Sequence, residues 1–124
     1  MRIISTDRAP DAIGPYSQGV IAGNLLFISG QIAIDPNTNE FFGGGIAAQT
    51  KRVLENISAV VQSAGTSIDK IVLCNVYLKD LSDFSAFNEV YAGYFANNPP
   101  ARVTVEVGNL PKNALVEISA IAEL

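Results

Sequence analysis

Histidine and tryptophan are absent from this sequence, and cysteine and methionine occur once each, as Cys74 and Met1. Without histidine, neither a Ser-His-Asp triad nor a Cys-His pair can form within the chain. A single thiol excludes an intrachain disulfide, and a structural zinc site would lack its thiolate and imidazole ligands. No acidic cluster suggests a carboxylate-bound magnesium ion. We therefore expect no metal site, and chemistry that depends on carboxylates, hydroxyls, arginine, lysine, tyrosine and backbone N–H groups.

Basic residues are also few. The chain has 8 Lys and Arg against 12 Asp and Glu, a net charge of −4, and Lys51-Arg52 is its only adjacent basic pair. Proteins that bind nucleic acids usually carry a basic stripe interleaved with aromatic residues, so we expect no nucleic-acid partner. No apolar run approaches the length of a membrane span, and Met1–Ser5 lacks the apolar core of a signal peptide. Together with the lone thiol, these absences predict a cytoplasmic protein without a membrane partner.

What the chain has in excess is apolar character. It contains 124 residues, of which 48% are hydrophobic and only 16% charged, with a mean hydropathy of +0.27. This length predicts one domain, residues 1–124, with a substantial core. The composition is rich for a small monomer with every face in water, so we expect part of the surface to be covered by self-association.

The N-terminal part predicts three short strands. Ile3-Ile4 is a short apolar start, and residues 17–22 and 25–29 form a hairpin through the Gly23-Asn24 turn. A second turn cluster covers residues 35–39.

A long amphipathic segment, residues 46–64, predicts the first helix. Apolar residues recur at helical steps along it: Ile46, Val53, Ile57, Val60 and Ala64. Gly65 follows as a left-handed cap. We expect the polar side of the helix, which includes Gln49 and Lys51, to face solvent.

The C-terminal half predicts a strand, a second helix and two more strands. Residues 71–78 are apolar and β-branched, and too short for a helix. An aromatic-rich stripe at helical spacing follows, which is typical of a core: Phe84, Phe87, Val90, Tyr91, Tyr94 and Phe95. Asn97–Pro100 ends this helix, and alternation predicts strands at residues 101–107 and 115–124.

The element order, β-β-β-α-β-α-β-β, predicts an α+β protein with both helices on one face of a sheet. In residues 101–107, alternation separates Val103 and Val105 from Arg102 and Thr104. We expect the valines to pack toward the helices. The opposite face is then expected to carry a mixed set of residues: Arg102, Glu117, Ser119 and Ile121. A mixed face suits an interface that contains a polar pocket.

Two charged residues are the main candidates for chemistry. Arg102 follows Pro99-Pro100-Ala101 at the start of a strand, where it is either a surface guanidinium beside an acid or a bidentate clamp for a carboxylate. Glu117 lies between Val116 and Ile118, where it is either an ordinary polar-face residue or a carboxylate that deprotonates water in a partly dry pocket.

Four further positions have both a structural and a functional interpretation. Ser29-Gly30 ends a strand, and its glycine permits close backbone approach. Tyr16 is either a loop aromatic packed on the core or part of a site, and Asn88 either caps a loop or contacts a ligand. Cys74, in the middle of a strand, is expected to be inert packing.

Five ordered blocks of sequence resemble the RidA/YjgF family, over nearly the whole chain from residue 3 onward. The blocks are 9–18 (APDAIGPYSQ), 29–32 (SGQI), 83–91 with its Asp-Phe and Phe-Asn-Glu-Val-Tyr pieces, 100–102 (PAR), and 110–118 with Leu-Pro-Lys and Val-Glu-Ile. The resemblance implies a chorismate-mutase-like fold, a mixed six-stranded sheet with two helices on one face. It also implies a homotrimeric barrel with ligand sites in clefts between protomers.

The same resemblance implies an activity that needs no cofactor: hydrolytic deamination of 2-enamine and 2-imine acids, such as 2-iminobutanoate and 2-iminopropanoate, to 2-oxo acids and ammonia. Arg102 would hold the substrate carboxylate and Glu117 would activate water. The implied pocket residues are Tyr16, Ser29, Gly30, Asn88 and the backbone of Thr104. Many relatives have Cys or Ser in place of Thr104, so its methyl group would affect which imine fits.

Two other functions remain open. The same clefts could bind a small carboxylate without catalysis, as a regulatory trimer that signals through a partner. Endoribonuclease or translation-inhibitor behaviour is associated with similar proteins, but the acidic balance, the missing basic stripe and the absence of histidine argue against it.

Overall fold

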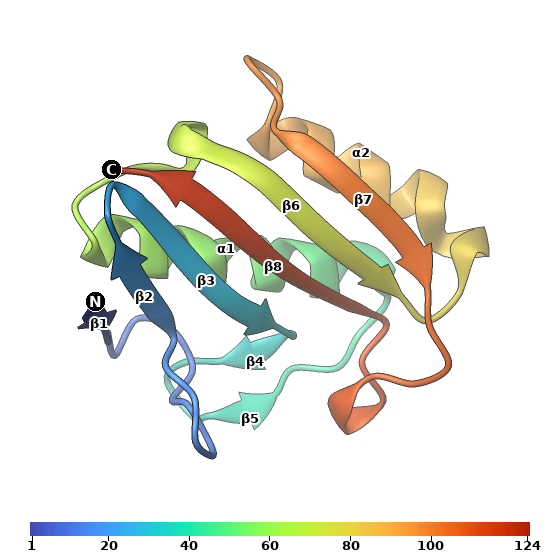
Figure 1. Cartoon of the computed structure of the whole chain (residues 1–124). Coiled ribbons are helices and arrows are strands. Elements are labelled where there is room, and N and C mark those ends of the chain that lie inside the picture. Colours follow the sequence, from blue (N-terminus) through green and yellow to red (C-terminus); the bar gives the residue numbers. More distant parts are fainter.

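The computed structural model describes all 124 residues and contains one six-stranded sheet, a two-stranded hairpin and two α-helices (Figure 1). The six strands are β1 (Arg2–Ile4), β2 (Gly19–Ala22), β3 (Leu25–Gln31), β6 (Ile71–Leu78), β7 (Ala101–Glu106) and β8 (Val116–Glu123). Their spatial order is β1-β2-β3-β8-β6-β7, and β6 and β7 are the one parallel pair. The expected mixed sheet is therefore confirmed. The predicted turn at residues 35–39 joins the two small strands β4 (Ile34–Asp35) and β5 (Glu40–Phe41).

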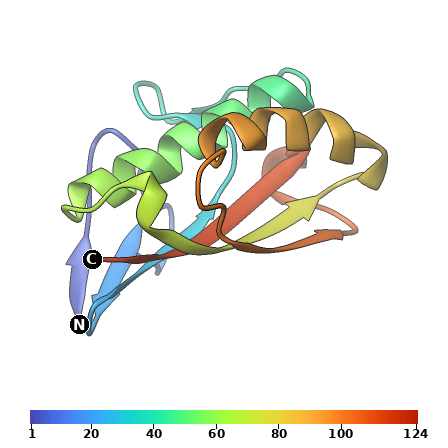
Figure 2. The same cartoon turned by 90° about the horizontal axis from the view of Figure 1, so that it is seen from above.

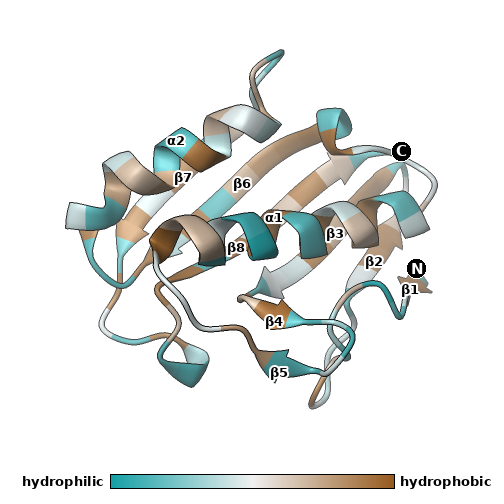
Figure 3. Cartoon of the chain, turned by 180° about the vertical axis from the view of Figure 1, so that it is seen from behind, coloured by the Kyte–Doolittle hydropathy of each residue, from teal (hydrophilic) through white to brown (hydrophobic).

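Both helices, α1 (Ile46–Ser63) and α2 (Phe84–Tyr94), lie on one face of the sheet, as Figure 2 shows. Figure 3 shows hydrophobic residues along the strands beneath them. The core fills the space between these layers, and its largest fully buried side chains include Leu26, Leu54, Ile57, Phe87 and Ile118. The α+β architecture with both helices on one side is confirmed.

The ends of the helices follow the local sequence signals. Gly65 adopts a φ of +88° after α1, and the next N–H, that of Thr66, donates to the carbonyl oxygen of Val61 at 3.2 Å. A short 3-10 helix, Leu81–Asp83, precedes α2, and at its start the Asp80 carboxylate accepts a hydrogen bond from the N–H of Ser82 at 2.8 Å. Side-chain oxygen capping of this kind satisfies an N–H that has no partner within the helix.

One expectation about a strand face was wrong. Arg102 and Thr104 pair with Cys74 and Val76, which are fully buried under the helices, so they point to the helix side of the sheet. The valines of β7 point to the open face, where Val103 is 51% exposed. Alternation groups residues by face, but it does not say which face the protein covers.

The polar side of α1 also differs from the expectation at Gln49, which is buried rather than solvated. Its amide donates to the carbonyl oxygen of Gly44 at 2.8 Å and accepts from the N–H of Leu115 at 2.9 Å. Buried backbone groups outside strands and helices need such partners. Gln49 thus ties the loop before α1 to the loop before β8.

The face of the sheet opposite the helices has no cover within the chain (Figure 2). Phe27, Val103 and Val105 lie on it and are 42%, 51% and 39% exposed. Exposed apolar side chains on an uncovered sheet face are typical of a contact surface. No helix in the chain combines the length and apolar character that crossing a bilayer requires.

Candidate functional site

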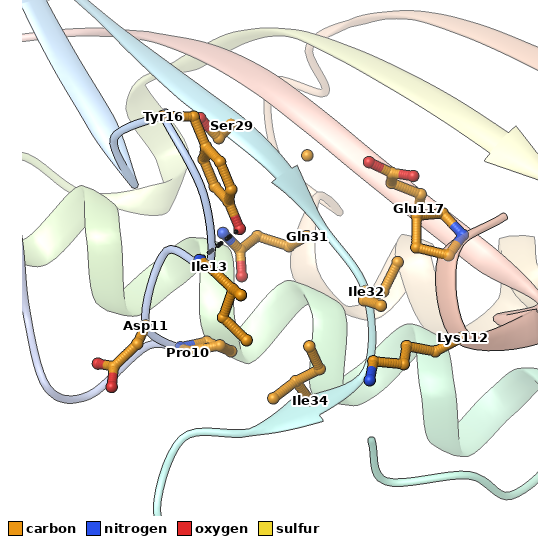
Figure 4. A pocket seen from close by; sticks show the side chains of 12 residues that line it. Pro10, Asp11, Ile13, Tyr16, Ser29, Gln31, Ile32, Ile34, Lys112 and Glu117 are labelled. Atoms are coloured by element: carbon orange, nitrogen blue, oxygen red, sulfur yellow. Dashed lines mark hydrogen bonds between the residues drawn. The ribbon is translucent and has the colours of Figure 1, made fainter. Parts of the chain in front are cut away.

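A cavity of about 590 Å³ lies where β3 ends and β8 begins (Figure 4). Four of the predicted site residues line it: Tyr16, Ser29, Gly30 and Glu117. Tyr16 and Glu117 stand on opposite sides of the space in Figure 4. The fold thus brings to one cavity four of the seven residues that the family resemblance assigns to the site.

An irregularity in β3 shapes this cavity. The β3–β8 register runs through Ile28 opposite Ala120 and resumes at Gln31 opposite Ile118, so two residues of β3, Ser29 and Gly30, face one residue of β8. Such a bulge redirects the side chains of a strand. The Ser29 hydroxyl donates to the carbonyl oxygen of Ser17, which attaches the bulge to the preceding loop.

Glycine at position 30 leaves room for the Glu117 side chain. A Cβ atom at Gly30 would lie 2.1 Å from Oε2 of Glu117, far inside van der Waals contact. The backbone of Gly30 has no positive φ that would itself demand glycine. The glycine is needed here for close approach of the carboxylate to the backbone.

Burial raises the pKa of Glu117 above the ordinary value of a glutamate. The cause is desolvation, because taking the carboxyl group out of water disfavours its charged form. A carboxylate of raised basicity beside a cavity suits proton transfer to and from water.

A buried glutamine positions the loop that carries Tyr16. Gln18 accepts a hydrogen bond from the N–H of Thr6 at 2.7 Å and donates to the carbonyl oxygens of Thr6, Ala9 and Pro10. The Tyr16 hydroxyl in turn accepts from the N–H of Ile13 at 3.4 Å. These bonds hold a loop of irregular backbone in one conformation against the cavity.

Asn56 of α1 supports the cavity from within the fold: it is fully buried and donates to the carbonyl oxygens of Ile32 and Ile34, at 3.3 and 2.9 Å. Both isoleucines line the cavity. A fully buried asparagine was not recognised from the sequence, where it lies on an otherwise ordinary helix.

Arg102 and Asn88 form a second, separate group. Nη1 of Arg102 donates to Oδ1 of Asn88 at 2.8 Å, and both residues line a shallower cavity of about 390 Å³ beside α2. Thr104 lines neither cavity, and its hydroxyl is buried without a partner. Within one chain, the predicted site is thus divided between the two faces of the sheet, with Glu117 on the open face and Arg102 under α2.

Lysine and proline residues that the sequence analysis did not assign also line the larger cavity. Pro111 and Lys112 stand beside Glu117, where Lys112 has a φ of +59°. Their Leu-Pro-Lys motif carries part of the family resemblance, but the left-handed conformation of a lysine has no sequence signal.

Burial raises the pKa of Cys74, which agrees with its expected inert role. No three His, Cys, Asp or Glu side chains lie together as potential ligands of a metal ion.

The chain is similar in sequence and in structure to known proteins. Residues 6–124 match the family model described as Endoribonuclease L-PSP. The chain is 58% identical to a RutC family protein of Saccharolobus solfataricus, over 98% of this chain and 96% of that protein. It is 43% identical to the human 2-iminobutanoate/2-iminopropanoate deaminase, over 98% of this chain and 88% of that one. Its structure matches the crystal structure of RidA from Psychrobacter with a TM-score of 0.96 and 45% identity, over all of both chains.

Proposed function

Because this chain belongs to the RidA/YjgF family, we propose that it hydrolyses 2-imine and 2-enamine acids to 2-oxo acids and ammonia. The observation that carries this proposal is the half-buried Glu117 carboxyl group of raised pKa, seated over Gly30 in a cavity. An imine carbon is already electrophilic, so its hydrolysis needs a positioned water and an anchored substrate rather than a covalent nucleophile.

The separation of Arg102 from Glu117 supports a site built from two copies of the chain. Arg102 lies on the edge strand β7, at the opposite side of the sheet from β3. A second copy that packs on the open apolar face would bring its own β7 edge toward the first copy's cavity. We propose a closed trimer in which Arg102 of the partner subunit completes each site, since closed rings repeat one interface.

The proposed reaction begins with the guanidinium of Arg102 binding the substrate carboxylate through two parallel hydrogen bonds. Glu117 accepts a proton from water as the water oxygen attacks the C=N carbon, and the imine nitrogen takes up a proton from bulk solvent, which the later loss of the hydroxyl proton returns. Glu117 then gives its proton to the amine nitrogen of the tetrahedral adduct, which becomes a leaving ammonium group. The C–N bond breaks, its electron pair leaves with ammonia, and loss of the hydroxyl proton gives the 2-oxo acid.

Arg102 provides the test. We expect Arg102→Ala and Arg102→Lys each to lower kcat/KM by about a hundred- to a thousandfold, because lysine keeps the charge but not the bidentate geometry. The assay follows ammonia release from imines made in situ from amino acids by a dehydratase or oxidase. Arg8→Lys is the matched control, since Arg8 is exposed and contacts only surface groups. Full turnover in a folded Arg102 variant contradicts the assigned role.

Two outcomes would favour another function. Saturable binding of 2-oxobutanoate without any imine turnover would favour a regulatory carboxylate-binding protein. Salt-dependent RNA binding would favour the ribonuclease named in the family description, against the net charge of −4 and the absence of histidine.

A further inference from the structure

We propose that one face of α2 is a positioning platform for Arg102, and that Phe84 at the start of this helix is therefore a positioning residue for the substrate-binding guanidinium. The platform consists of the rings of Phe84, Phe87 and Tyr91. The effect of the platform on substrate binding rests on the function proposed above. The contact between the platform and Arg102 does not depend on that function.

Three aromatic rings of α2 lie within cation–π distance of the guanidinium of Arg102. The Cζ atom of Arg102 lies 5.4 Å from the ring centre of Phe84, 5.7 Å from that of Phe87 and 4.7 Å from that of Tyr91. All three distances fall within the range of cation–π attraction. The rings also pack on one another, at 6.4 Å between Phe84 and Phe87 and 5.4 Å between Phe87 and Tyr91. Helical spacing therefore builds one continuous surface under the cation.

An aromatic platform differs from an acidic partner because it leaves most of the N–H donors of the guanidinium free to bind substrate. Ring faces attract the guanidinium but accept few of its hydrogen bonds, and Asn88 accepts one bond, from Nη1. Most of the five N–H donors of Arg102 are left without a partner on the platform, and a bidentate carboxylate contact needs two of them. An aspartate in place of the rings would compete with the substrate. The platform orients the cation before substrate arrives, which reduces the ordering cost of binding.

The three rings differ in how deeply they are buried in the hydrophobic core. Phe87 is fully buried in the core and Tyr91 is 5% exposed, whereas Phe84 is 37% exposed. The hydroxyl of Tyr91 is buried without a hydrogen-bond partner, and the centre of its ring lies 4.7 Å from Cζ of Arg102. Phe84 can therefore be changed with little effect on the core, and Tyr91→Phe keeps the platform intact.

The direct test follows the Nε–H resonance of Arg102 by NMR of protein labelled in its arginines. Arg102→Lys identifies the resonance among those of Arg2, Arg8 and Arg52. In the unmodified protein we expect ring currents to displace it from the resonances of the exposed arginines. Phe84→Leu should move it toward them, Phe84→Tyr should restore it, and Phe42→Leu, which alters an exposed aromatic elsewhere, should leave it unchanged.

The kinetic test uses the same variants. We expect Phe84→Leu to raise KM about three- to tenfold with kcat within about twofold, because a cation held equally in ground and transition states affects binding alone. Phe84→Tyr should keep the original KM. An Arg102 resonance that does not move in Phe84→Leu overturns the platform. A resonance that moves in a protein without imine turnover leaves the platform standing and rejects the proposed function.

Discussion

The carboxyl group of Glu117 links catalysis to stability through a single pKa. Burial raises this pKa in the folded state above the ordinary glutamate value of 4.5. A group with a raised folded pKa contributes stability that is fully present below its unfolded pKa and is lost as the pH rises through the folded pKa. The ionised form that activates water is thus the form that the fold disfavours.

We expect Glu117→Gln to lower kcat by about a hundred- to ten-thousandfold, since it removes the proposed base. The same change should remove the loss of stability that occurs as the pH rises from about 4.5 through the raised folded-state pKa of Glu117, because a neutral amide has no ionised form to desolvate. Thermal unfolding followed from acid to neutral pH measures this, and the wild-type kcat/KM should rise with pH over the same interval.

The matched control for this prediction is Glu89→Gln, which removes the same charge from the exposed side of α2. It should leave both activity and the pH dependence of unfolding close to wild type. If Glu117→Gln unfolds with the wild-type pH dependence, desolvation of the ionised Glu117 does not significantly lower the stability of the folded protein.

At the scale of elements, Gln18 holds the loop before β2. The replacement Gln18→Leu keeps the side-chain volume but strands the N–H of Thr6 and the carbonyl oxygens of Thr6, Ala9 and Pro10. We expect it to lower the free energy of unfolding by about 2–4 kcal/mol. Urea unfolding measures the change, and activity should fall because Tyr16 loses its support. Gln62→Leu, on an exposed side of α1, should change stability by less than about 0.5 kcal/mol. An unchanged midpoint in Gln18→Leu would show that other contacts hold the loop.

Strand β7 shows why a strand can be predicted correctly from the sequence while the sheet face that its residues occupy is predicted wrongly. Its alternation correctly separates Arg102 and Thr104 from Val103 and Val105. The valines nevertheless lie on the open face, and Arg102 lies under α2 beside aromatic rings. The aromatic rings of a helix can cover a cation on an edge strand. An apolar sheet face can remain open when it serves as a contact surface. Neither circumstance is visible in the strand's own sequence.

At the scale of the whole molecule, the division of the site predicts complementation between inactive variants. Arg102→Ala and Glu117→Gln should each be inactive alone. When the two proteins are unfolded together and reassembled in equal amounts, sites that combine an intact Arg102 with an intact Glu117 should form. Random assembly of a closed ring predicts about a quarter of wild-type activity.

The control for complementation is a simple mixture of the two folded variants without reassembly. It should stay inactive until subunits exchange. Recovery of no activity after reassembly, with correct size by light scattering, would place both residues of a working site in one chain and contradict the proposed two-copy site.

The sequence by itself determined the two helices, the six strands of the main sheet and their order, because periodicity and turn residues are local properties. It did not predict the small strands β4 and β5 on either side of the turn at residues 35–39. Ordered motifs indicated the family, and the lack of histidine excluded chemistry that needs an imidazole of this chain. The family resemblance assigned seven residues to one site, of which the fold brings Tyr16, Ser29, Gly30 and Glu117 to one cavity. The tertiary structure alone decided that Arg102 lies on the other face of the sheet, over the rings of α2. The physical reason is that the face a strand residue takes depends on which side of the sheet the helices cover, and long-range packing sets that side.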